Sequence, residues 1–155
     1  MKAIRRILFA TDFSRASRAA WRQARNLASS PRCELFVAHV LQIPSPLSPD
    51  GFPLPRTADE LAAAARREAE VAIGSILKEA RRSRFPATGL LLTGKPEKAI
   101  ARAARKHRAD IIVVGTRGRT GLRRLLLGSV AARIIAEAPC PVLAVPERSA
   151  SRDVK

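Results

Sequence analysis

The sequence has no tyrosine, one tryptophan and an aromatic content of only 4%. Proteins that bind single-stranded nucleic acid stack bases on aromatic side chains, so this composition disfavours that class. No apolar run approaches the roughly 18 residues that a membrane-spanning helix needs. The apolar stretch near the start is short and ends in Thr11-Asp12, which argues against a signal peptide. A soluble globular protein without a membrane partner is expected.

Cysteine is also scarce, and the two residues present, Cys33 and Cys140, form neither a CxxC pair nor a disulfide framework. Each precedes a predicted strand. If two other strands separate these strands, the gap exceeds the ~7 Å between Cα atoms that a disulfide allows. Two buried thiols and a cytoplasmic location are therefore expected.

Acidic residues are few beside the basic ones. The chain has 29 lysines and arginines against 13 acidic residues, which gives a net charge of +16. A field of that sign attracts nucleotides, nucleic acids and acidic surfaces without selecting among them. The arginine-rich composition is equally compatible with a compositional bias that has no functional content, and both interpretations stay open.

Short apolar runs alternate with amphipathic stretches along the whole chain. The runs predict strands at 4–10, 35–40, 87–93, 110–114 and 141–145. The amphipathic stretches predict helices at 14–29, 57–82, 96–107 and 128–137, with N-terminal signals at Ser14, Thr57 and Pro96. Near-continuous apolar strands in this alternation predict a parallel sheet with helices on both faces. Residues 1–146 are expected to form one domain, followed by a polar tail at 147–155.

The segment 42–56 has too many prolines for regular structure. It begins just beyond Val40, at the end of the second predicted strand. A loop of this length in a small domain is often functional or disordered. We expect it to form a partial lid over a pocket at that strand end.

A glycine-rich basic loop follows the fourth predicted strand. Gly115 and Gly118 would let backbone N–H groups approach a phosphate, and Gly128-Ser129 opens a helix whose free N–H groups favour an anion. The loop therefore predicts a phosphate site. Residues 89–96 nearly match a P-loop, but their middle is an apolar strand and Pro96 replaces the hydroxyl that would bind Mg²⁺.

The loop also fits the pattern G-x2-G-x9-G-[ST], with Gly115, Gly118, Gly128 and Ser129 at its fixed positions. Residues 9–14, 38–40 and 139–145 match, in order, the first strand and turn, the second strand end and the closing strand of one family. On these residues the chain resembles the universal stress protein family, and specifically its ATP-binding branch. The resemblance covers nearly the whole chain.

The resemblance implies a doubly wound, Rossmann-like α/β fold with five parallel strands in the order 3-2-1-4-5. The point at which the strand order switches then lies between the first and fourth strands, where ligands bind in such sheets. This order places Thr11-Asp12 beside Gly115. The resemblance also implies a homodimer in which the C-terminal strands of two chains meet.

The implied ligand is ATP, bound without a Walker loop, with Mg²⁺ as a candidate companion ion. The backbone around Thr11, Asp12 and Val40 would hold the adenine, with Asp12 also near the sugar and phosphates. The full set of expected binding residues is Ala10, Thr11, Asp12, Val40, Gly115, Thr116, Arg117, Gly118, Gly128, Ser129 and Val130. Many ATP-binding members have proline where this chain has Ala10, which loosens the turn slightly.

The function implied is an ATP-dependent switch or scaffold in a stress response. No residue can be named as a general base that would activate water for in-line attack on a γ-phosphate, so no catalytic residue is named and any ATP hydrolysis should be slow. His39 and His107 lack catalytic partners in the sequence and are expected to be structural. Two alternatives stay open: a basic module that binds nucleic acid, and a nucleotide-free dimeric interaction protein of the same fold.

Overall fold

The computed structural model describes residues 4–28, 32–53, 55–83, 85–116 and 127–147, and every structural feature below lies within these ranges. Its strands are β1 (Arg6–Ala10), β2 (Glu34–Val40), β3 (Ala87–Leu92), β4 (Ile111–Gly115) and β5 (Val142–Val145). Its helices are α1 (Arg15–Leu27), α2 (Ala58–Arg82), α3 (Pro96–Lys106) and α4 (Ser129–Glu137). These bounds agree with the predicted elements to within a few residues.

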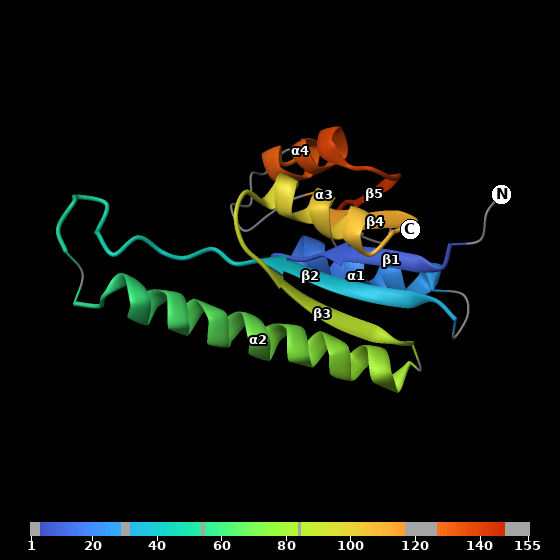
Figure 1. The fold of residues 1–155 in the computed structure, drawn as a ribbon, viewed down its shortest axis with the longest axis horizontal. Coiled ribbons are helices and arrows are strands. Elements are labelled where there is room, and N and C mark those ends of the chain that lie inside the picture. Colours follow the sequence, from blue (N-terminus) through green and yellow to red (C-terminus); the bar gives the residue numbers. More distant parts are fainter. Residues whose placement is uncertain (1–3, 29–31, 54, 84, 117–126, 148–155) are drawn as a thin grey trace, which may run out of the picture.

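The five strands form one parallel sheet in the order β3-β2-β1-β4-β5, as Figure 1 shows and as predicted. Side chains alternate between the two faces of each strand. Ile7 and Phe9 of β1 therefore pack in one apolar cluster with α1 and α2, whereas Leu8 and Ala10 pack in a second cluster with α3 and α4. The predicted doubly wound fold, with helices on both faces, is confirmed.

Local signals define the helix starts. The hydroxyl of Ser14 accepts a hydrogen bond from the backbone N–H of Ser17 at the start of α1. Thr57 and Glu60 form the predicted capping box at the start of α2. Pro96 occupies the first turn of α3, where its missing N–H costs nothing.

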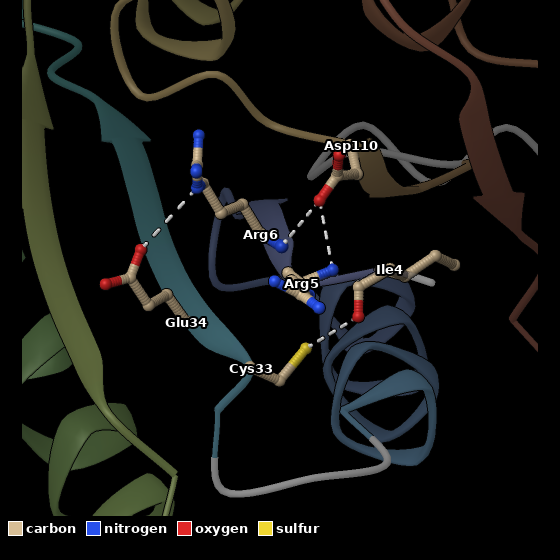
Figure 2. Close-up of polar contacts among 6 residues, drawn as sticks. All are labelled: Ile4, Arg5, Arg6, Cys33, Glu34 and Asp110. Carbon is tan, nitrogen blue, oxygen red and sulfur yellow. Dashed lines mark hydrogen bonds and ion pairs between the residues drawn. The ribbon is translucent and has the colours of Figure 1, made fainter. Parts of the chain in front are cut away.

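An acidic side chain joins the starts of the strands, at the edge of the sheet opposite their carboxyl ends (Figure 2). Oδ2 of Asp110 accepts hydrogen bonds from the backbone N–H groups of Arg5 and Arg6, at 3.0 and 2.9 Å. The guanidinium of Arg6 lies 3.9 Å from the carboxylate of Glu34 at the start of β2. These contacts tie β4 to β1 and β1 to β2, so Asp110 has a structural role.

Both cysteines are free thiols, as predicted, but the prediction that both are buried holds for Cys33 and is wrong for Cys140. Cys33 is buried, and its thiol donates to the carbonyl oxygen of Ile4 at 3.4 Å (Figure 2). Burial raises the pKa of Cys33, and the charge of Asp110 adds to the effect. Burial and Asp110 also raise the pKa of Cys140, although this residue is only half-buried. A raised pKa favours the protonated thiol, which is the less nucleophilic form.

The proline-rich segment differs from the expected lid. Beyond Gln42 its described residues are largely exposed and run alongside the N-terminal part of α2, away from the sheet (Figure 1). A small hairpin closes its tip, where the N–H of Ser48 donates to the carbonyl of Phe52 and Leu47 bridges Pro53. Phe52 is 71% exposed. Proline favours extended, solvated backbone, so beyond Gln42 this segment forms an arm that projects away from the strand ends.

Only the later part of helix α2 packs against the sheet. Its buried residues, Ala69, Ile73 and Ala80, all lie beyond its first eleven residues. The earlier part extends past the sheet beside the arm (Figure 1). None of the helices in the described part of the chain has the length and apolar character needed to cross a bilayer.

Candidate functional site

A pocket of about 360 Å³ lies at the carboxyl ends of β1, β2 and β4, bounded by the starts of α3 and α4. This position is the topological switch point, and the volume lies in the range of small-molecule sites. Most of the expected binding residues line it: Ala10, Thr11, Asp12, Val40, Gly115, Thr116, Gly128, Ser129 and Val130. The other two, Arg117 and Gly118, lie outside the described residues. Two sequence signals about 100 residues apart thus meet at one pocket.

The pocket has further lining residues that the sequence reasoning did not select. They are Ser17, Ala38, His39, Gln42, Pro96, Ile100, Val114, Ala131 and Ile134. Most are small or apolar residues that read as ordinary core in a sequence. For two of them, strand register was the signal that could have found them. Both Ala38 and Val114 pair with Ala10, which was an expected binding residue.

The turn after β1 holds the carboxylate of Asp12 in place. Its Oδ1 accepts hydrogen bonds from the backbone N–H of Ser14 at 3.0 Å and from the hydroxyl of Ser17 at 2.5 Å. The backbone N–H of Asp12 in turn donates to Oγ of Ser17 at 3.2 Å. Ser17 is only 3% exposed, so water competes little for these bonds. Asp12 is therefore both a helix-start acid and a fixed carboxylate at the pocket wall.

Phe13 follows the lining residue Asp12 and adopts a left-handed backbone conformation, with φ of 63°. This conformation is uncommon for a residue with a bulky side chain and often occurs at functional turns. The ring of Phe13 stacks on that of His39, with centroids 4.4 Å apart. Nδ1 of His39 lies 2.8 Å from the carbonyl oxygen of Thr11, to which it donates. His39 thus anchors the turn, which agrees with the structural role expected for it.

Gly115 is also required by the packing of α1 on β4. A Cβ atom there would lie 2.8 Å from the backbone carbon of Ala16 and 3.0 Å from the backbone nitrogen of Ser17. Glycine therefore allows the first turn of α1 to pack directly on the end of β4. This packing is a second reason for glycine here, beside the expected approach of a phosphate, which stays a prediction.

The start of α4 offers uncapped backbone donors. Gly128, and not Ser129, occupies the N-cap position, and no side chain among the described residues caps this helix. Ser129 and Val130 form its first turn and line the pocket. The N–H of Gly128 donates to the carbonyl of Thr116 at 2.7 Å, which holds the helix start against the end of β4. Free N–H groups and the helix dipole make this wall favourable for an anion.

Small and apolar side chains also line the pocket. Ala38, Val40, Pro96 and Ile100 line it. Carbonyl groups of β2 alternate in direction, and that of Ala38 faces β1, where it accepts from the N–H of Thr11. The same alternation directs the backbone N–H and C=O of Val40 past the end of β1, toward the pocket. An apolar slot with directed backbone groups thus shares one pocket with the start of α4.

The site contains little that would bind a metal by itself. Among the described lining residues, Asp12 supplies the carboxylate. No group of three or more metal-binding side chains occurs in the described ranges. Mg²⁺ is commonly held by one or two carboxylates together with ligand phosphates, and Asp12 fits that limited role.

The fold and pocket define a doubly wound α/β protein with a switch-point site that suits a small anionic ligand. The family model for the universal stress protein family matches residues 3–146. The chain is 36% identical over 141 residues to the universal stress protein MJ0531 of Methanocaldococcus jannaschii, which covers 91% of this chain and 81% of that protein. The chain belongs to the universal stress protein family.

Solved structures agree with this assignment. The hypothetical protein MJ0577 of Methanocaldococcus jannaschii superposes with a TM-score of 0.82 at 26% identity, over 96% of this chain and 100% of that one. A universal stress protein solved in complex with cAMP superposes with a TM-score of 0.67 at 25% identity, over 93% of this chain and 98% of that one. A relative of the same fold therefore binds an adenine nucleotide.

Proposed function

We propose that this protein binds ATP in the switch-point pocket and acts as a nucleotide-dependent switch or scaffold in a stress response. The main support is that one pocket of about 360 Å³ holds both an apolar slot at Val40 and the start of α4 at Ser129, where no described side chain caps the helix. The complex of a related protein with cAMP adds support for the adenine class. The proposal selects ATP among adenine nucleotides because the sequence carries the pattern G-x2-G-x9-G-[ST] of the ATP-binding branch.

In this proposal the adenine lies in the apolar slot, where the backbone of Val40 recognises its edge. The phosphates lie at the first turn of α4, where Ser129 and Val130 contribute backbone N–H groups. The fixed carboxylate of Asp12 faces the sugar or a Mg²⁺ carried by the phosphates. None of the described lining residues is arranged as a general base for water, so we expect slow hydrolysis at most.

Val130→Glu tests this placement because it should affect folding and binding in opposite directions. Val130 is 40% exposed, and a carboxylate in the first turn of a helix stabilises it by about 0.3–1 kcal/mol. The same charge repels a phosphate, so ATP affinity should fall by about tenfold or more, as measured by calorimetric titration.

Ala132→Glu is the matched control. It adds the same charge to the exposed side of the same helix, outside the lining residues, and should leave ATP affinity nearly unchanged. Equal loss of affinity in both variants, or no loss in either, would contradict the placement of the phosphates at α4. Titration with AMP and cAMP beside ATP shows whether the longer phosphate chain is preferred.

A further inference from the structure

A second cavity lies at the far edge of the sheet from β5. This β3–α3 groove has a volume of about 530 Å³ and is lined by the consecutive residues 89–93 and by one side of α3, including Arg102, Lys106 and His107. The ring of His107 packs on Phe36, with centroids 4.5 Å apart, and closes the groove toward β2. The groove shares no lining residue with the switch-point pocket.

The groove exposes the backbone of an edge strand. The carbonyls of Pro86 and Leu92 accept from β2, so alternate residues from 86 to 92 face β2 and the residues between them, Ala87, Gly89 and Leu91, direct their N–H and C=O groups outward. β3 is the terminal strand of the sheet, and no described strand pairs with this edge. An unpaired edge of this kind is a template for another extended chain.

Gly89 lines the groove with its backbone, and the missing side chain adds no room to the groove. A Cβ atom on Gly89 would lie 2.5 Å from Cγ2 of Ile73, so this side of β3 is closed by α2. The outward backbone of Gly89 and Leu91 therefore lines the groove directly. Leu90 and Leu92 face the other side of the sheet and form a half-buried apolar floor beside α3.

The charge beside the groove is of one sign. Lys98, Arg102, Arg105 and Lys106 are exposed on α3, and no ion pair involves them among the described residues. The acidic residue of this helix, Glu97, is 9% exposed and faces Arg133 of α4 at 3.8 Å. A second copy of this chain, with its own net charge of +16, would be repelled from this surface.

We propose that the β3–α3 groove binds an extended acidic segment of a partner protein, which adds to β3 as a further strand. Backbone pairing with Gly89 and Leu91 would supply affinity, and alternate acidic side chains would meet Arg102 and Lys106. The alternating donors and acceptors of the edge match a polypeptide backbone. These backbone groups favour a peptide over a nucleic acid, because a nucleic acid would contact only the cationic side chains.

The test uses the full isotope-labelled chain and a blocked eight-residue peptide of alternating glutamate and valine, followed by NMR. We expect saturable shifts and slower hydrogen exchange at the amides of Gly89 and Leu91. The same peptide N-methylated at alternate residues keeps its charge but loses backbone donors, and it should cause no saturable change. Shifts that survive N-methylation, or no saturable change with either peptide, would overturn the proposal.

Charge reversal provides the second arm. Arg102→Glu with Lys106→Glu should weaken peptide binding by about tenfold. The matched control, Arg18→Glu with Arg22→Glu, changes two exposed arginines of α1 on the opposite face and should leave binding unchanged. Equal weakening by both pairs would show non-specific attraction. Stronger shifts at the same amides with a single-stranded oligonucleotide would assign the groove to nucleic acid. Either result overturns the proposal.

Discussion

At the scale of single residues, the pocket depends on side chains that fix the turn after β1. Asp12 was recognisable in the sequence because it follows an apolar strand and begins a helix. Ser17 was not, since a serine inside a helix has many uses. Only the fold brings its hydroxyl to 2.5 Å from Asp12, where it fixes the carboxylate.

Ser17→Ala tests this role. The variant removes one of the two hydrogen bonds on Oδ1 of Asp12, so the carboxylate should lose its fixed direction. We expect ATP affinity to fall severalfold and the free energy of unfolding to fall by about 1 kcal/mol. Ser17→Thr keeps the hydroxyl and serves as the control, with denaturant unfolding and calorimetry as the measurements. Unchanged ATP affinity in the alanine variant would refute a positioning role for Ser17.

At the scale of elements, hydrophobic patterning predicted every strand and helix of the described chain to within a few residues. Periodicity carries that information because buried faces repeat along each element. Contacts between distant elements leave no such pattern. The contact of α1 with Gly115 and the outward course of the 42–56 arm therefore required the structure.

Gly115→Ala tests the packing of α1 on β4. Its Cβ would meet backbone atoms at 2.8 and 3.0 Å, which cannot move as a side chain can. We expect destabilisation of about 1–3 kcal/mol in denaturant unfolding.

Gly74→Ala makes the same chemical change but should alter the free energy of unfolding in the opposite direction. Gly74 lies inside α2, and nothing lies within 4 Å of its Cβ position, so alanine should stabilise by about 0.5–1 kcal/mol. If Gly115→Ala is as stable as the original protein, the proposed reason for this glycine is wrong.

At the scale of the whole molecule, the two sheet edges have different expected partners. β5 is the terminal strand opposite β3, and the family resemblance implies a homodimer through it. The carbonyls of Pro141 and Val145 face β4, so the N–H of Ala144 faces outward. We propose that this N–H pairs with the same strand of a second copy.

Ala144→Pro removes that outward donor and leaves the ladder to β4 in place, which edge strands tolerate. Light scattering should find a dimer for the original chain and a monomer for the variant. Ala144→Ser keeps the N–H and should stay dimeric. A monomeric original chain, or a dimer that persists with proline, would contradict pairing through β5.

The strand order and the place of the pocket followed from sequence because element order and family resemblance both pointed to them. The β3–α3 groove did not, since its outward backbone groups depend on strand register. In the sequence, the cationic side chains beside the groove are only part of a net charge of +16. Which of the basic residues gather on one surface depends on the fold.

The most direct test of nucleotide binding is mass analysis of the small molecules released when the purified protein is denatured. The proposal predicts ATP in amounts close to one per chain. It also predicts that the Val130→Glu protein carries far less, although it is folded. Recovery of no adenine nucleotide, together with no heat of ATP binding to the emptied protein, would contradict the account.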